Sequence, residues 1–185
     1  MKKRTKRLLF IILLLLAGTV IFLLPTKLPK DAWSNLETEL EKHKSTIDKQ
    51  EIGIYIDYNK PVFKKRLWIV NLKTKEVILN SHVSHAWNSG FLKPTKFSNE
   101  VGSNTSCSGT FNTLNSYESQ FGTGEYKIGM RIQGLDKNRN DNALKRNIVF
   151  HSSYSPWSSG CFMSTPKTNK KIIELTRNGC IVVAK

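Results

Sequence analysis

The stretch "HSSYSPWSSGC" holds His151 and, ten positions later, Cys161. Both are residue types that attack and activate carbonyl groups. The thiolate is the attacking form of cysteine, yet a free thiol is mostly protonated at neutral pH. An imidazole within hydrogen-bond reach can take that proton, giving a thiolate–imidazolium pair with a lowered cysteine pKa. The spacing is also compatible with an inert loop cysteine after a core histidine, so both interpretations stay open on spacing alone.

The residue before the cysteine and the cysteine count both favour the reactive interpretation. Gly160 lets a ligand approach the backbone closely, so the amides of Gly160 and Cys161 could face a developing oxyanion. The chain has three cysteines, and an odd number in an exported protein leaves at least one thiol unpaired. Cys107 and Cys180 could pair with each other, but the sequence does not decide this.

The elements that must position this couple are mainly strands. Apolar residues recur with a period of two, or in short runs, in five segments, and 66–72 and 76–83 form a hairpin around a short turn. These segments are 52–57, 66–72, 76–83, 125–134 and 147–150. Between them, residues 84–124 are rich in Ser, Asn, Thr and Gly, which predicts loops over a β scaffold.

One helix is well signalled near the end of the chain. Thr165 can cap it, Pro166 suits its first position, and Gly179 closes it before a terminal strand at 180–184. A shorter amphipathic helix is expected within 31–50. The sum is a mainly β domain with a late helix and none of the regular strand–helix alternation of a parallel α/β fold.

The amino end predicts a membrane anchor. Residues 1–7 carry five basic side chains, and Leu8 to Leu24 is a run of 17 uncharged residues. As a helix this run spans about 25 Å, slightly less than a bilayer core. We expect a basic cytoplasmic tail at 1–7, a signal anchor at 8–25, a linker with a helix at 26–51 and the functional domain at 52–185. Export after cleavage of a signal peptide is the alternative.

The basic charge, a pair of histidines and a segment that contains Asp and Asn each raise the question of a nucleic-acid or metal partner. With 29 Lys and Arg against 14 Asp and Glu the chain is strongly basic. The basic residues are scattered and not interleaved with aromatic residues, so we expect no nucleic-acid partner. His82 and His85 lie three apart on a strand and point to opposite faces, so we expect no metal there. The segment "DKNRND" at 136–141 lacks the glycine and glutamate of a calcium loop.

Beyond these single features, several blocks occur together in the order of a known family. The tetrapeptide "SSGC" at 158–161 follows a strand-terminal histidine, and three longer blocks accompany it: "RLWIVNLKTKEVILNSHVSHAWNSG" at 66–90, "YKIGMRIQGLDKNRNDNA" at 126–143 and "RNIVFH" at 146–151. The chain thereby resembles the L,D-transpeptidases of the YkuD type, and among them the murein L,D-transpeptidase catalytic domain branch. The resemblance covers roughly residues 52–185.

The resemblance implies a β sandwich-like domain that acts on peptidoglycan stem peptides without a metal or organic cofactor. A cysteine attacks the carbonyl of a diamino acid, the terminal D-alanine leaves, and an amine of a neighbouring stem resolves the thioester into a 3→3 cross-link. By position Cys161 is then the nucleophile, His151 the base and the Ser152 carbonyl the group that orients the ring. Ser158 and Gly160 complete the motif.

His85 lies in a block that matches the family and is a candidate for lining the cleft. Arg131 lies near a strand that leads into the site and could clamp a carboxylate, and Trp157 is close enough to the site to line a pocket. A purely structural role stays open for each of these three residues. The chain departs from the family pattern at Ser159 and Met163, where many relatives have histidine and arginine. Two alternatives therefore stay open. One is a hydrolase with the same residues, either an L,D-carboxypeptidase or a cross-link endopeptidase. The other is a catalytically weak module that binds the cell wall.

Overall fold

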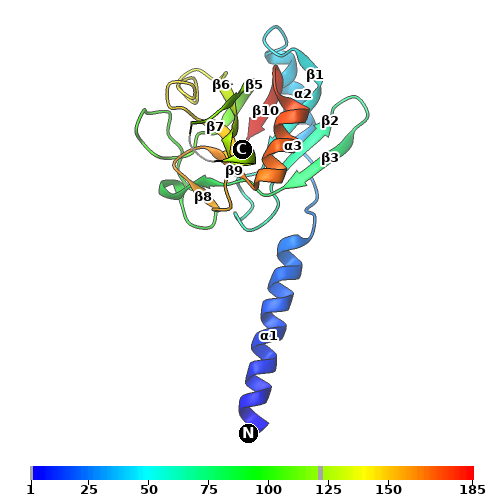
Figure 1. Ribbon diagram of the computed structural model, residues 1–185. Coiled ribbons are helices and arrows are strands. Elements are labelled where there is room, and N and C mark those ends of the chain that lie inside the picture. Colours follow the sequence, from blue (N-terminus) through cyan, green and yellow to red (C-terminus); the bar gives the residue numbers. More distant parts are fainter. Residues whose placement is uncertain (1, 121–122) are drawn as a thin grey trace.

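The computed structural model describes residues 2–120 and 123–185 (Figure 1). Its three α-helices are α1 (Lys2–Leu23), α2 (Ala32–Lys42) and α3 (Pro166–Thr176). Its strands are β1 (Lys49–Ile56), β2 (Leu67–Asn71), β3 (Glu76–Ser81), β4 (His85–Ala86), β5 (Gly109–Glu118), β6 (Ile128–Gly134), β7 (Val149–Ser152), β8 (Trp157–Ser158), β9 (Phe162–Ser164) and β10 (Cys180–Ala184). Two short 3₁₀ helices, η1 (Trp87–Ser89) and η2 (Gly124–Lys127), join them.

Eight of these strands form one mixed sheet in the order β3-β2-β1-β10-β5-β6-β7-β9. Most neighbours are antiparallel, but β1 pairs with β10 and β7 with β9 in parallel. The remaining two, β4 and β8, form a small separate sheet. The predicted sandwich is therefore built mainly from one sheet. Strands β2 and β9, which are far apart in the strand order, contribute side chains to the same core.

The central strands are buried on both faces, which explains their uninterrupted apolar sequences. In β1, Ile54 and Ile56 enter one core while Tyr55 enters the other. The same alternation in β10 sends Val182 to the first core and Val183 to the second. Each face then needs a cover, because an apolar sheet face left open would contact water.

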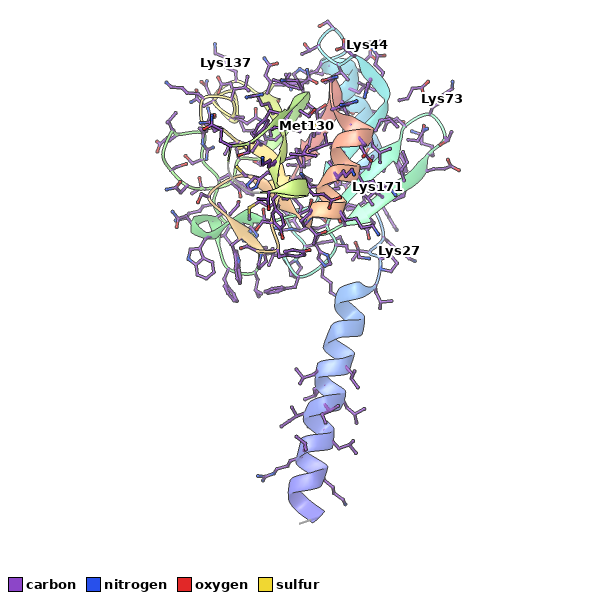
Figure 2. All side chains as sticks on the ribbon, in the orientation of Figure 1. Lys27, Lys44, Lys73, Met130, Lys137 and Lys171 are labelled. Atoms are coloured by element: carbon purple, nitrogen blue, oxygen red, sulfur yellow. The ribbon has the colours of Figure 1, made fainter. Side chains whose placement is uncertain are left out.

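The two shorter helices supply these covers. Ile172 and Ile173 of α3 pack into the larger core, on the face where β5, β6, β7 and β9 also place their aromatic and aliphatic side chains. Ala32 and Leu36 of α2 pack on the opposite face against β1, β2 and β10. Figure 2 shows the labelled lysines at the periphery of the domain and Met130, which is fully buried, in its interior.

The predicted mainly β fold with a late helix is confirmed, and the predicted hairpin is formed by β2 and β3. The prediction of loops in 84–124 is wrong for β5, which lies within this segment and pairs with both β10 and β6 near the middle of the sheet. The short helix predicted within 31–50 is formed by α2, which ends at Lys42.

The amino-terminal helix α1 projects away from the domain (Figure 1). Among the residues that the structure describes, no helix meets the length and hydropathy of a membrane span. The side chains of residues 17–23, which belong to the predicted anchor at 8–25, lie outside the described residues, as do those of most of the tail at 1–7.

Candidate active site

The parallel pairing of β7 with β9 brings His151 and Cys161 to the same place. Phe150 pairs with Phe162, so the histidine follows one partner of this pair and the cysteine precedes the other. Both side chains line one open cavity of about 390 Å³. Its wall also includes Ser152 from β7 and Tyr117 from β5, together with residues of β6 and η2. A strand pair thus provides a rigid base for two side chains that the loop 153–160 separates in sequence.

The thiol of Cys161 is half-buried, and its Sγ lies 3.5 Å from the Asn147 carbonyl oxygen. Burial raises the pKa of Cys161 above its ordinary value, while a hydrogen bond from the Val149 backbone and the charge of Arg146 act in the opposite direction. Desolvation disfavours the charged form, and here it outweighs the two opposing effects. The sequence predicts a lowered cysteine pKa, and the burial of the sulfur reverses this.

The imidazole of His151 is oriented by the backbone next to it. Its Nδ1 lies 3.3 Å from the carbonyl oxygen of Ser152, which is the contact that the family resemblance implies. A proton held on Nδ1 by this carbonyl leaves a lone pair on Nε2. Burial lowers the pKa of His151, so the neutral ring dominates at neutral pH. In the resting state both groups that line the cavity are therefore neutral, Cys161 as a thiol and His151 as an imidazole.

Gly160 and Ser158 form the turn that precedes the cysteine. Gly160 has φ = 133°, and a Cβ placed there would come within 2.7 Å of the Ile148 side chain, so only glycine fits. Its amide donates to the Ser158 hydroxyl at 3.1 Å, and that hydroxyl donates to the Cys161 carbonyl at 2.8 Å. The Gly160 amide is thus used within the turn, which corrects the expectation that it faces an oxyanion.

A family model described as an L,D-transpeptidase catalytic domain matches residues 25–184. The chain belongs to this family. Because the match begins ahead of α2, the L,D-transpeptidase domain includes the helix that the sequence assigns to a linker at 26–51.

Two solved structures illustrate the similarity at low sequence identity. The enzyme from Enterococcus faecium is 14% identical over 73% of this chain and 50% of its own, with a TM-score of 0.47. The helical cell shape determining protein Pgp2 from Campylobacter jejuni is 7% identical over 72% of this chain and 47% of its own, with a TM-score of 0.52. The chain spans about half the length of these proteins. No curated protein matches the chain.

Of the predicted substrate contacts in this L,D-transpeptidase domain, His85 is the one that the structure contradicts. His85 is fully buried in β4, where its Nδ1 accepts from Arg66 at 2.8 Å and its Nε2 donates to the Gly90 carbonyl at 2.7 Å. Burial, with the charge of Arg66 as a smaller cause, lowers the pKa of His85 to about 4. Both ring nitrogens are already used, so the residue is structural.

Neither Arg131 nor Trp157 belongs to the described lining of the Cys161 cavity. The Arg131 guanidinium lies over the Tyr117 ring, 4.5 Å from its centroid, and the two line a neighbouring cavity of about 190 Å³. Trp157 donates from its indole to the Phe91 carbonyl at 2.9 Å and packs edge-on against Trp87.

Two residues at the site of this L,D-transpeptidase domain were not predicted from the sequence. Tyr117 lines both cavities, but it lies on β5, which the sequence assigned to a loop. Ser84 donates from its hydroxyl to the Cys161 carbonyl at 3.0 Å and accepts from the Met163 amide at 2.9 Å. No local pattern marks Ser84, because its partners are 77 and 79 positions away.

All three cysteines of the L,D-transpeptidase domain are free; Cys107 and Cys180 are buried, whereas Cys161 is half-buried. Burial raises the pKa of Cys107 to about 11 and that of Cys180 to about 12. The pairing that the sequence leaves open is therefore absent, and both thiols are kept protonated and away from solvent.

Proposed function

We propose that this domain transfers acyl groups between peptidoglycan stem peptides, with Cys161 as nucleophile and His151 as general base. The observation that carries the proposal is that both side chains line one open cavity, with the lone pair of the His151 Nε2 left available by the Nδ1 contact to Ser152. Membership of the L,D-transpeptidase family supports the choice of substrate.

The first half-reaction forms a thioester. His151 takes the thiol proton as Sγ attacks the carbonyl carbon of the diamino acid in a stem tetrapeptide. The amide C–N bond then breaks, and D-alanine leaves as the amine after accepting the proton from the imidazolium. A base is needed in this step because burial keeps Cys161 protonated in the resting state.

The second half-reaction returns the enzyme to its starting state. An amine of a neighbouring stem attacks the thioester carbonyl, His151 takes the proton of that amine, and the thiolate leaves and is reprotonated. One amide bond is exchanged for another, so the reaction needs neither a metal nor an organic cofactor. When water replaces the amine, the same residues catalyse hydrolysis.

The proposed substrate also sets the proposed location. Peptidoglycan stem peptides lie outside the cytoplasm, so we propose that the domain acts there. This location does not depend on how α1 meets a membrane, and it leaves anchoring and export after cleavage as alternatives.

Mass analysis of products tests the proposal. Full-length protein is incubated with a stem tetrapeptide that carries a free side-chain amine. We expect loss of D-alanine and a dimeric product in the wild type, and neither in Cys161→Ala. Free tripeptide without dimer would assign the hydrolase instead.

A second buried cysteine provides the matched control. Cys107→Ala removes a free thiol that lies in the core, and we expect it to keep the activity. Product formation that persists in Cys161→Ala would refute the assignment of the nucleophile. A wild-type protein that binds peptidoglycan and releases no D-alanine would identify a wall-binding module.

A further inference from the structure

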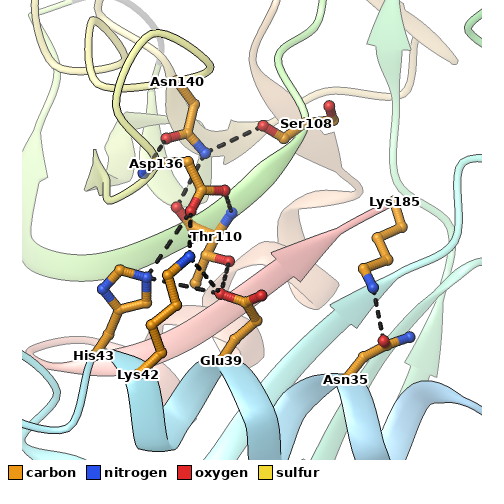
Figure 3. A network of polar contacts seen from close by, with 9 residues as sticks. All are labelled: Asn35, Glu39, Lys42, His43, Ser108, Thr110, Asp136, Asn140 and Lys185. Carbon is orange, nitrogen blue, oxygen red and sulfur yellow. Dashed lines mark hydrogen bonds and ion pairs between the residues drawn. The ribbon is translucent and has the colours of Figure 1, made fainter.

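A second group of reactive side chains lies where α2 meets the loop after β6 (Figure 3), and none of its members lines the Cys161 cavity. It consists of Glu39 and His43 from the end of α2 and Asp136 from that loop. One ligand atom from each lies within 4.8 Å of the other two. The His43 Nε2 is 3.7 Å from Glu39 Oε2 and 3.9 Å from Asp136 Oδ1.

The spacing in sequence explains two of the three ligands. Residues four apart lie on the same face of a helix, so Glu39 and His43 point together toward the sheet. Asp136 comes from more than ninety positions away and reaches them because β6 ends beside β5. The arrangement therefore joins the leading helix to the body of the domain.

Both carboxylates are held in place by a single strand residue. The Thr110 amide donates to Asp136 Oδ2 at 2.8 Å, and its hydroxyl donates to Glu39 Oε2 at 2.9 Å. This leaves Asp136 Oδ1 facing the imidazole. Gly109 contributes by its size, because a Cβ there would come within 2.3 Å of Asp136 Oδ2. Such fixed outer contacts are what orient carboxylates around a metal ion.

The imidazole Nε2 lies within ion-pair distance of both carboxylates but has no hydrogen bond among the described residues. This nitrogen is also buried. A buried polar atom without a hydrogen bond is uncommon and costs stability. An ion between the three side chains would bind this nitrogen.

Lys42 provides the charge balance in the present arrangement. Its Nζ lies 3.5 Å from Glu39 Oε2 and 3.5 Å from Asp136 Oδ1, and more than half of its side chain is exposed. The ammonium group therefore competes with an ion for the same two carboxylates. Because its stem is flexible and reaches solvent, it can leave without disturbing the fold.

We propose that Glu39, His43 and Asp136 bind one divalent transition-metal ion of the zinc class. One imidazole and two carboxylates with a position open to water suit Zn²⁺, whereas Ca²⁺ and Mg²⁺ require oxygen ligands. Ligand atoms around tetrahedral zinc lie roughly 3.3 to 3.5 Å apart, so binding shortens the two distances from the His43 Nε2, 3.7 Å and 3.9 Å, by a few tenths of an ångström and draws the two carboxylates together as well. The ion would link α2 to the loop after β6, outside the cavity that Cys161 lines.

Calorimetric titration of the chelator-treated full-length protein with ZnCl₂ tests this proposal. We expect one Zn²⁺ per chain with a dissociation constant in the low micromolar range or below, and a rise in melting temperature that MgCl₂ does not produce. His43→Gln and Glu39→Gln should each weaken binding at least tenfold. Lys42→Met should tighten it severalfold, because the competing cation is gone.

Two further variants separate this site from other causes of binding. Lys44→Met removes the neighbouring lysine of the Glu41 ion pair and should leave the affinity unchanged. Cys161→Ala should keep the one-to-one stoichiometry, since the thiol is not a ligand of this site. Absence of zinc binding in the wild type, equal affinity in His43→Gln, or stoichiometric binding that is lost only in Cys161→Ala would each overturn the proposal.

Discussion

The hydroxyl of Ser84 donates to the backbone carbonyl of Cys161 at 3.0 Å, although 77 positions separate them in sequence. The same hydroxyl accepts from the Met163 amide, so Ser84 contacts the backbone on both sides of Phe162. The preceding residue, Val83, is held by two hydrogen bonds from the fully buried Arg66 to its carbonyl. The position of Cys161, the proposed nucleophile, thus depends on a buried segment outside its own loop.

Ser84→Ala should slow acylation of Cys161 by about tenfold, because a shift in the backbone displaces the sulfur from the imidazole. The lost hydrogen bonds should also cost about 1–3 kcal/mol of the free energy of unfolding. Stopped-flow acylation by a β-lactam probe, together with urea denaturation, measures both effects.

A matched substitution separates the two effects. The Thr113 hydroxyl likewise donates to a carbonyl, that of Thr176 at 2.5 Å, and accepts from an amide, that of Cys180 at 2.8 Å. Thr113→Val should therefore destabilise the fold to a similar degree while the acylation rate stays near the wild-type value. Equal slowing in both variants would mean that Ser84 acts only through stability.

The pH dependence of the acylation rate should be that of a neutral Cys161 thiol and a neutral His151 imidazole. Because the pKa of His151 lies below and that of Cys161 above its ordinary value, the rate should be flat across neutral pH and fall only below the normal imidazole range. In His151→Ala the rate should instead rise about tenfold per pH unit into the alkaline range, since the thiolate fraction then limits it. A bell-shaped profile centred below pH 7 in the wild type would point to a preformed ion pair.

His85 should make the fold sensitive to mild acid. Its pKa of about 4 in the folded state lies below the ordinary value, so between that pH and about 6.5 the unfolded chain binds the additional proton. Stability is therefore complete above pH 6.5 and is lost as the pH falls, by up to about 3 kcal/mol near pH 4. Urea denaturation at several pH values should show this loss, and His85→Gln should reduce it. An unchanged slope in that variant would assign the sensitivity to other groups.

Gly160→Ala should reduce both stability and acylation. The residue has a positive φ, which costs about 1–3 kcal/mol for an L side chain, and the new methyl group would clash with Ile148. Gly102→Ala is the matched control, because Gly102 also has a positive φ but open space around it. We expect Ile148→Val to recover part of the loss in Gly160→Ala and nothing in Gly102→Ala, as measured by melting temperature and probe acylation.

The sequence predicts the parts of this structure that short segments determine. The sequence marks His151 and Cys161 as candidates because a strand, a turn and a glycine near one another in sequence carry them, and the structure places both in the lining of one cavity. The strand β5 was missed because its buried residues Thr110, Asn112 and Thr113 are polar and imitate a loop. The prediction of a substrate contact at His85 is wrong because the sequence does not reveal that Arg66 lies beside it and uses its Nδ1.

The position of β10 has a consequence for the order in which the domain assembles. This strand follows every other strand in the sequence, yet it lies between β1 and β5 inside the sheet. Until it is inserted, the β1–β2–β3 meander and the group from β5 onward share no ladder of hydrogen bonds. Such long-range joining slows folding. A chain that emerges amino end first therefore holds two incomplete half-sheets, each with an open edge, until its final strand closes the gap.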